Sequence, residues 1–461
     1  MAHVFDLASN WTADTTILIV QGWYGIPSDD GGADPDYGNW DIDSSSWHSG
    51  DPSTYPAIPY ANQDASRCNG GHRYIGSKLR PLTGIYSDSG REDNAASIAH
   101  IDRMLGVVER AGDPRGRVNV IACTLGLVQF TSHNGYEPGD ADYTQDLDTR
   151  YRHLDKMLER ANAAGLTNCV AANYEAYYIW QFFSGTYTSK LARLGAVALD
   201  LEDLVNKLKN DNAAWKVDGR VVICWYEGTL NIPGSGEEDI TPAEWSATME
   251  AVRTATGHDF FVIGRNYGAS DVAWLDGLFP WIRYQNYLSA DGSTNRLKAS
   301  NWAQDGINDF IASAVAANSG RVALANFSPG FDDYVLEWGA GNTSRVIPRT
   351  SDTIKGQFDG YQALDDAGPR VDGLVLATWN GYPEGHCIEP TVQDNGEVLG
   401  LFTEQMAIYR GENPSASETE TLLDIWRTAT PSITCPVQYR QGGRRENVAT
   451  GEALTSGHGT T

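Results

Sequence analysis

Three glutamates, Glu175, Glu227 and Glu384, stand shortly after short apolar runs of the kind that form buried strands. Breaking a glycosidic bond requires a carboxylic acid that protonates the leaving oxygen, and usually a second carboxylate roughly 5–10 Å away. If the strands are parallel neighbours, their carboxyl ends bring such side chains to one mouth. The three glutamates are therefore candidates for a catalytic acid and its partner. Each can equally be a structural hydrogen-bonding residue.

Aromatic and amide side chains follow the same runs. Aromatic faces stack on the apolar faces of sugar rings, and amides and carboxylates bond their hydroxyls, so carbohydrate is the first substrate class we consider. The candidate stacking residues are Trp23, Tyr24, Trp225, Tyr226, Trp379 and Tyr382, and the candidate hydroxyl-binding residues are Asn286, Asp332, Asp333 and Asn380. The alternative for the aromatics is packing at the rim of the fold.

Other ligand classes find less support in these segments. A phosphate ligand would call for clustered Lys and Arg, and a metal ion for a His-rich set, and neither pattern follows the apolar runs. His386 is more typical of a hydrogen-bonding neighbour than of a metal ligand, and the acidic cluster Asp29–Asp43 lacks the spacing of a calcium loop. We therefore expect no metal and no cofactor.

The elements that must position these residues alternate between strands and helices. Eight apolar runs are candidate strands: Ile17–Val20, Val118–Cys123, Asn168–Ala172, Arg220–Trp225, Phe260–Gly264, Trp281–Tyr287, Arg321–Phe327 and Asp372–Trp379. Helical spacing follows at Asn94–Ala111, Asp146–Ala164, Leu191–Asn210, Pro242–Thr256 (with Thr241 as N-cap), Ser270–Leu275, Asn301–Asn318, Thr353–Asp366 and Phe402–Tyr409.

Eight such alternations predict an α/β fold, a (β/α)8 TIM barrel. A doubly wound open sheet is the competing architecture, but no glycine-rich phosphate loop follows the first strand. We expect one barrel domain over residues 1–425, with a long inserted loop region at 27–91 after the first strand. Residues 426–461 are expected to form a C-terminal extension, a flexible tail that is disordered or serves for attachment.

The composition narrows the choice of partner. With 34 basic and 60 acidic residues the net charge is −26, which disfavours nucleic acid and anionic membrane surfaces as partners. No apolar run approaches the roughly 20 residues that span a bilayer, and the first residues do not form a secretory signal. We expect synthesis in the cytoplasm, with buried free thiols at Cys123, Cys169 and Cys224. The final location stays open, including a virion or an extracellular site reached by a non-standard route.

Several stretches resemble glycoside hydrolase family 99 and its relatives, the endo-α-mannosidases and endo-α-mannanases. The motifs occur in the family's order over Ile17–Arg410. The segments that carry the likeness are Gly22–Pro27 with Asn39–Asp41, Leu82–Ser87 followed by Asp93 and Ile98–Gly112, Ser328–Asp333, and Trp379–Pro390 (WNGYPEGHCIEP), which is similar to the family's "FNEWHEGTQIEP". The last segment also resembles the "WNDYGES"-like signature of fungal α-1,3-glucanases.

The resemblance implies a role for Glu384 and exposes a departure. In the family, two acidic residues lie three apart in this signature; the later is the general acid, and the earlier is a base that assists attack by the sugar's own 2-hydroxyl. The later position here is Glu384, whereas the earlier one is Gly381, which has no side chain. Either Glu227 or, second, Glu175 supplies the base, or the mechanism differs, or the barrel no longer hydrolyses.

Two functions follow as hypotheses. The first is an endo-acting glycoside hydrolase on a polysaccharide or glycan, with Glu384 as general acid and a second carboxylate from another strand end. The alternative is a non-catalytic carbohydrate-binding or structural barrel, for example a bacteriophage tail or virion component with other virion proteins as partners. A phosphate-dependent sugar enzyme or isomerase would need a basic clamp or a metal site, which the strand ends do not offer.

Overall fold

The fold is taken from a computed structural model, whose described residues are 11, 15–21, 41–43, 60–65, 70–75, 81–83, 95–110, 117–125, 153–176, 189–226, 240–265, 274–282, 296–305, 321–332, 346–367, 371–382, 384–391, 393–414, 416–429, 438–441 and 444–447. All statements below concern these residues. The predicted site residues Trp23, Tyr24, Glu227, Asn286 and Asp333 lie outside them.

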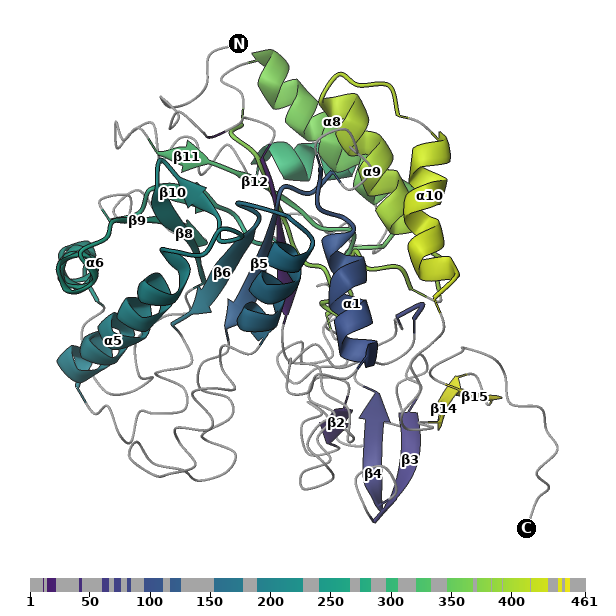
Figure 1. The fold of residues 1–461 in the computed structure, drawn as a ribbon. Coiled ribbons are helices and arrows are strands. Elements are labelled where there is room, and N and C mark those ends of the chain that lie inside the picture. Colours follow the sequence, from purple (N-terminus) through teal and green to yellow (C-terminus); the bar gives the residue numbers. More distant parts are fainter. Residues whose placement is uncertain are drawn as a thin grey trace.

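Parallel strands form the centre of the molecule (Figure 1). Nine segments pair in the order expected for a nearly closed (β/α)8 barrel, which confirms the predicted fold class. They are β1 (Thr16–Gln21), β5 (Val120–Leu125), β6 (Val170–Glu175), β8 (Arg220–Tyr226), β9 (Phe260–Arg265), β10 (Gly277–Phe279), β11 (Val322–Ala323), β12 (Ala325–Phe327) and β13 (Leu374–Leu376). A short strand, β7 (Lys216–Val217), adds to β8 in antiparallel fashion.

The seventh strand closes the ring in two parts. β11 pairs with β10, and β12 pairs with β13, so that a single stretch of chain serves both neighbours in turn. Leu324 lies at the change of partner, where its amide donates to the carbonyl of Leu278 (2.9 Å), whereas the next amide, of Ala325, donates to Gly373 (2.9 Å). β13 then pairs with β1 and completes the circle.

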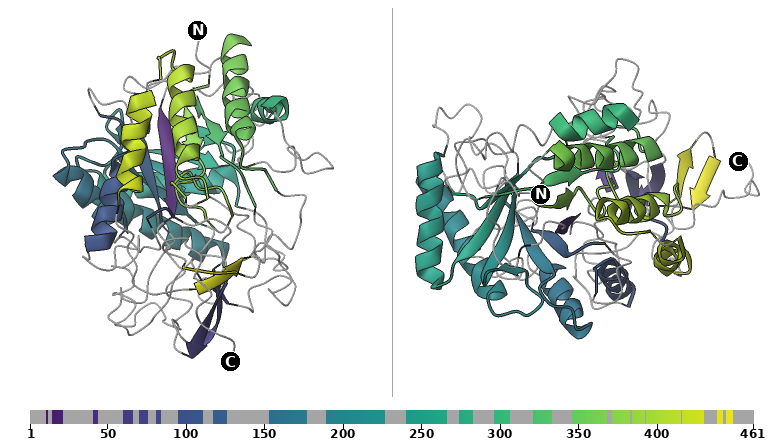
Figure 2. Two further views of the ribbon diagram at one scale, coloured as in Figure 1. Left: turned by 90° about the vertical axis from the view of Figure 1, so that its right-hand side faces the viewer. Right: turned by 90° about the horizontal axis from the view of Figure 1, so that it is seen from above.

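Helices cover the outside of the strands, as the view from above in Figure 2 shows. The labelled helices are α1 (Ala95–Leu105), α5 (Lys190–Leu208), α6 (Pro242–Thr256), α8 (Ser351–Ala367), α9 (Glu397–Tyr409) and α10 (Ala416–Arg427), and residues 153–163 and 296–305 are also helical. α6 begins where its sequence predicts: Thr241 accepts from the amide of Glu244, whose carboxylate accepts in return from the Thr241 amide.

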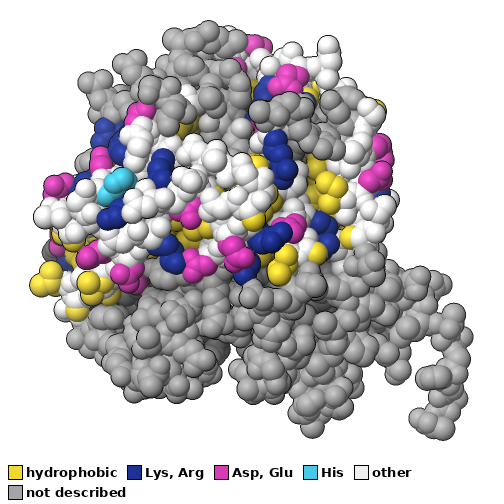
Figure 3. All heavy atoms as spheres, viewed as in Figure 1, with side chains coloured by type: hydrophobic (Ala, Val, Ile, Leu, Met, Phe, Trp, Pro, Cys, Tyr) yellow, Lys and Arg dark blue, Asp and Glu magenta, His cyan; other side chains and the backbone are white. Residues whose placement is uncertain are grey.

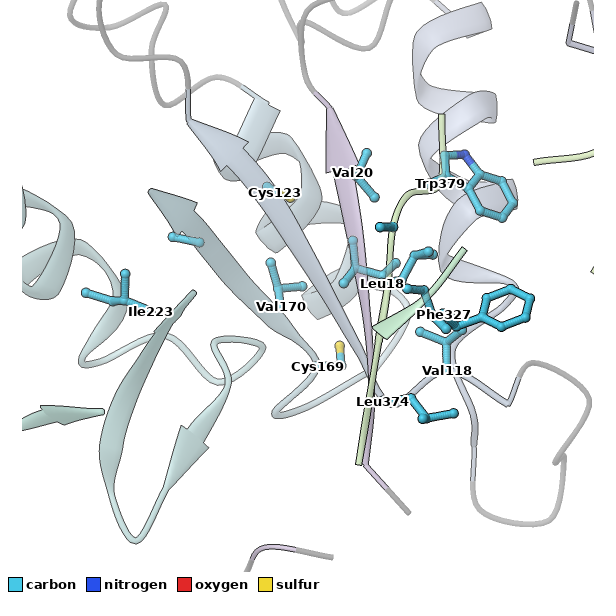
Figure 4. Close-up of a cluster of buried hydrophobic side chains, with 14 of the residues drawn as sticks. Leu18, Val20, Val118, Cys123, Cys169, Val170, Ile223, Phe327, Leu374 and Trp379 are labelled. Carbon is cyan, nitrogen blue, oxygen red and sulfur yellow. The ribbon is translucent and has the colours of Figure 1, made fainter. Parts of the chain in front are cut away.

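The buried side chains form two layers on opposite faces of the strands. One fills the barrel with residues such as Ile19, Val222 and Ile263, and Trp11 packs on Trp215 among them. The other lies between the strands and the helices, where Figure 4 shows Leu18, Val20, Phe327 and Trp379. Both layers follow from the alternation of side chains along a strand, and strands buried on both faces have nearly continuous apolar sequences.

Two predicted elements differ from the structure. The sixth strand is β10 (Gly277–Phe279), so Trp281 follows the strand instead of beginning it. Of the predicted Trp281–Tyr287, Trp281 and Ile282 are not in a strand, and the rest lies outside the described residues. The aromatic residues that follow the strand are typical of strands, and they led the prediction to place the strand too far along the chain. The short helix predicted at Ser270–Leu275 is absent at its described end, because Trp274 and Leu275 are not helical; the rest of it lies outside the described residues.

The inserted region and the C-terminal extension each contain β-structure. Within residues 27–91, β2 (Asp41–Asp43), β3 (Tyr60–Ala65) and β4 (Gly70–Ile75) form an antiparallel sheet in the order β2-β4-β3. In the extension, β14 (Gln438–Gln441) pairs with β15 (Arg444–Asn447). α10 crosses the predicted boundary at 425, and its Trp426 is buried against Trp379 with ring centroids 5.6 Å apart. The domain division itself stays a prediction.

The described surface mixes both charge signs. On the face shown in Figure 3, acidic and basic side chains alternate over short distances, and several are paired, as Arg160 is with Asp102 (2.7 Å). Among the described helices, none is both long enough and apolar enough to cross a membrane.

Candidate active site

The carboxyl ends of three neighbouring strands direct side chains into one end of the barrel. Ala171, Cys224 and Ile263 belong to the layer inside the barrel, so alternation directs Glu175, Tyr226 and Arg265 to the same interior side. Glu175 lies opposite Tyr226 in the pairing of β6 with β8. Tyr226 and Arg265 are half-buried, whereas Glu175 is buried. This end is therefore lined by polar groups above an apolar interior.

An arginine between two aromatic rings forms the first part of the site. The guanidinium carbon of Arg265 lies 3.5 Å from the ring centroid of Tyr226 and 4.3 Å from that of Trp281. The two rings meet edge to face at 6.2 Å. Cation–π contact of this kind fixes the position of a guanidinium, whose N–H groups are hydrogen-bond donors. Tyr226 and Trp281 thus hold a hydrogen-bond donor at the mouth.

A histidine–glutamate pair forms the second part. His386 is fully buried, and its Nε2 lies 2.8 Å from Oε2 of Glu384, whose side chain is 24% exposed. The imidazole is held edge to face by Trp281 and stacked by Phe331, each with ring centroids 6.0 Å away. Trp281 therefore joins the two parts, because it contacts both Arg265 and His386.

The histidine ring occupies the space beside Gly381. A Cβ atom at position 381 would lie 2.6 Å from Oγ1 of Thr378 and 2.7 Å from Nδ1 of His386, closer than carbon atoms approach in proteins. An acidic side chain at this position would require the imidazole to move. Glycine at position 381 and the imidazole of His386 therefore go together, because the ring fills the space that a side chain at position 381 would need.

Backbone hydrogen bonds fix the loop Trp379–Pro390, which we call the signature loop. The amide of Thr378 donates to the carbonyl of His386 (2.8 Å), and the amide of Asp332 donates to that of Glu384 (2.7 Å). Arg349 donates to the carbonyl of Cys387 and to Oδ2 of Asp394 (2.7 Å). Glu384 thereby sits on a supported segment that follows the eighth strand, β13.

A second glutamate of the same loop has a different environment. Glu389 is fully buried, accepts from the hydroxyl of Tyr382 (2.9 Å), and has Nδ1 of His100 3.7 Å from its Oε1. Burial, with further effects of Arg103 and His153, holds the pKa of His100 well below its usual value. We call Gly381, Glu384 and His386 the front of the signature loop, and Tyr382, Glu389 and His100 its back.

Four residues predicted to bind sugar are instead buried parts of the scaffold. Trp225 points away from the barrel interior and packs among Tyr174, Trp245 and Trp274. Trp379 and Tyr382 are also buried, and Asn380 is tied to the backbone of Gln21 by two 2.8 Å bonds. The prediction took every aromatic or amide near a strand end as facing the mouth. Trp225 faces away because alternate residues of a strand face opposite sides, whereas the other three are buried by the packing of the signature loop. These four side chains cannot reach a ligand without moving.

The remaining predicted residues divide as follows. Glu175, Tyr226 and Glu384 lie where they were expected, at the ends of β6, β8 and the eighth strand. Asp332 is half-buried next to Glu384, through its backbone bond to that residue. Arg265, Trp281 and Phe331 were not predicted, although Arg265 does end the fifth strand and could have been found from that position alone. In the described part of the chain, no group of three or more His, Cys, Asp or Glu could hold a metal ion.

Comparison of the coordinates with solved structures identifies relatives in fold. An endo-α-mannosidase of glycoside hydrolase family 99 from Bacteroides thetaiotaomicron, in complex with bis-tris-propane, aligns over 86% of this chain and 98% of its own, with a TM-score of 0.51 and 19% identity. The fold resembles that of a family 99 glycoside hydrolase. A second structure of the Bacteroides thetaiotaomicron enzyme gives 0.49 at 21% identity over 82% of this chain and 88% of that one.

A third solved structure and two searches by sequence complete the comparison. A glycoside hydrolase-like protein aligns over 93% of this chain and 96% of its own, with a TM-score of 0.49 at 13% identity. No protein-family model and no curated protein matches the chain. At 19% identity the likeness to the family 99 structure establishes the fold alone, and the chemistry must be argued from the side chains themselves.

Proposed function

We propose that the protein is a glycoside hydrolase that cleaves a polysaccharide or glycan at the carboxyl end of the barrel, with Glu384 as general acid. The observation that carries this proposal is the environment of Glu384. Its carboxyl group is partly exposed and hydrogen-bonded to the buried imidazole of His386, which contacts the Trp281 ring that also holds Arg265. A proton donor must be positioned by its neighbours and must be accessible to substrate, and the bond to His386 and the partial exposure of Glu384 support this assignment.

The other groups at the mouth suit a sugar ring. Tyr226 and Trp281 offer aromatic surface, and the guanidinium between them can bond hydroxyl oxygens. Glu175, buried at the end of β6, is the described candidate for the second carboxylate. Glu227 is the other candidate, one residue beyond Tyr226, and Trp23, Tyr24, Asn286 and Asp333 remain proposed sugar contacts outside the described residues.

A panel of glycans tests the proposal directly. We would begin with α-mannans and α-mannobiosides, because the relative in fold is an endo-α-mannosidase, and include α-glucans and bacterial polysaccharides. Glu384→Gln should lower kcat by about 10²–10⁴-fold, while Glu397→Gln, at an exposed position on α9, serves as the matched control. Cleavage that Glu384→Gln leaves unchanged would contradict the assignment.

A non-catalytic carbohydrate-binding or structural barrel is the second candidate. The observation in its favour is that the imidazole fills the space at Gly381, where the family carries an acidic residue. The same panel separates the two functions, since a binding protein would retain oligosaccharide without cleaving it. Trp281→Ala should then weaken binding by roughly tenfold, the loss of about one aromatic stack.

A further inference from the structure

We propose that His386 is a positioning residue, that it receives a hydrogen bond from Thr378 and donates one to Oε2 of Glu384, and that it thereby confines the transferable proton of Glu384 to Oε1. This inference rests on the proposed function and specifies how its acid works. It concerns Thr378, to which no role was assigned from the sequence, and His386, which the sequence predicted only as a hydrogen-bonding neighbour.

The first step is the hydroxyl of Thr378. Thr378 is fully buried, and its Oγ1 lies 3.3 Å from Nδ1 of His386, its side-chain partner among the described residues. A buried hydroxyl is stabilised when it donates its hydrogen, because an unpaired buried donor costs free energy. Nδ1 is an acceptor only when it carries no proton. The hydroxyl therefore selects the tautomer of His386 that is protonated at Nε2.

The second step is the bond from Nε2. In this tautomer Nε2–H donates to Oε2 of Glu384 over 2.8 Å, so Oε2 acts as an acceptor whether or not the carboxyl group is ionised. The proton of the neutral carboxyl group then belongs to Oε1. In the opposite tautomer Glu384 would have to donate its own proton to Nε2, and it would be a poor acid for a substrate.

The third step is the chemistry. The Oε1–H bond breaks as the proton passes to the glycosidic oxygen, and the electron pair of the breaking C–O bond leaves with that oxygen. A water molecule or the second carboxylate forms the new bond at the anomeric carbon. Glu384 becomes a carboxylate, and the Nε2–H bond strengthens because its acceptor is now charged. His386 keeps its proton throughout. A hydrogen-bond donor that is already in place when negative charge develops on Glu384 lowers the activation barrier of the proton transfer.

The rigid setting of the ring supports this role. His386 is enclosed by Trp281 and Phe331 and occupies the space next to Gly381, so rotation of the imidazole would collide with its neighbours. Full burial prevents His386 from touching a substrate, so any effect on catalysis must pass through Glu384.

Nitrogen-15 NMR of histidine-labelled protein tests the tautomer without a ligand. We expect the signal that disappears in His386→Gln to show a protonated Nε2 and an unprotonated Nδ1. Thr378→Val, which keeps the side-chain shape but removes the donor, should change this pattern, whereas His258→Gln, at the opposite end of the barrel, should not. A protonated Nδ1 in the wild-type protein would overturn the proposal.

Kinetics test the consequence, with 2,4-dinitrophenyl and 4-methylumbelliferyl α-mannobiosides as probes. Thr378→Val should lower kcat on the 4-methylumbelliferyl substrate by about 10²-fold with little change in KM. The 2,4-dinitrophenyl group leaves with little need of protonation, so its rate should change by less than about threefold. Equal losses of rate on both substrates would overturn the positioning role of His386.

The two proposals can fail separately. If the wild-type protein cleaves neither the probes nor the panel, the proposed function falls, and with it the catalytic use of the Thr378–His386–Glu384 chain. If the protein is active but Nδ1 is protonated, or the variants lose rate on both leaving groups, only the positioning role of His386 falls. Should His386→Gln fail to fold, Thr378→Val and the wild-type spectrum still decide the outcome.

Discussion

The signature loop contains two glutamates five residues apart that differ in almost every physical respect. At the front, Glu384 is partly exposed and has one buried ring nitrogen as a partner. At the back, Glu389 is fully buried and bonded to Tyr382 near His100. The comparison teaches that residue type does not determine role: a partly exposed carboxylate is accessible to a ligand, as the proposed general acid must be, whereas an enclosed one holds the loop in place.

Removal of the back carboxylate should have the largest effect on stability. Glu389→Ala takes the acceptor from the buried Tyr382 hydroxyl and leaves a cavity next to His100, and we expect a loss of about 3–5 kcal/mol in the free energy of unfolding. Glu384→Gln should change that free energy by less than about 0.5 kcal/mol, because position 384 is partly exposed. Urea denaturation of both variants measures the difference. Similar losses would end the distinction between front and back.

Filling the space at Gly381 should have the next largest effect. Gly381→Ala places a methyl group against His386 and Thr378, and we expect a cost of about 1–3 kcal/mol from overpacking. In a His386→Ala background the same change should cost less, because the contact with the ring is gone and the contact with Thr378 remains. The double-mutant cycle reports this coupling directly. Additive costs would show that His386 does not occupy that space.

The back of the loop should also make stability depend on pH. The pKa of His100 is lowered in the folded protein, so the unfolded chain binds a proton that the folded one does not. Stability should be fully present above the ordinary histidine pKa of about 6.5 and decline as pH falls below it, by at most about 1.4 kcal/mol per pH unit. His100→Gln should flatten the curve between pH 5 and 7. An unchanged slope would mean that His100 is protonated in the fold.

The barrel could be predicted from the sequence because its signal is repeated eight times. Short apolar runs of Val, Ile and aromatics alternate with helical spacing, and α6 even shows its capping residues, Thr241 and Glu244. The prediction of the sixth strand was wrong because, among the described residues, the pairing segment is Gly277–Phe279. The aromatic run that follows it matches the composition of a strand better than this segment does.

The site was less predictable, for a geometric reason. Strands buried on both faces have no polar residues to mark which side chains face inward, so Trp225 and Tyr226 looked alike although one packs under α6 and the other lines the mouth. His386 reaches the space at Gly381 only because of how the loop turns, and no local pattern encodes that turn. The resemblance indicated Glu384, but not the residue that holds it.

The change of partner at Leu324 has a consequence for the whole mouth. A closed ring of tilted strands must accumulate an offset in pairing as it goes round, and here part of that offset is taken up within one strand, between β11 and β12. The chain continues from that joint to Phe331 and Asp332, and the amide of Asp332 donates to the carbonyl of Glu384 (2.7 Å). The strand that completes the barrel thus also supports the loop that carries Glu384.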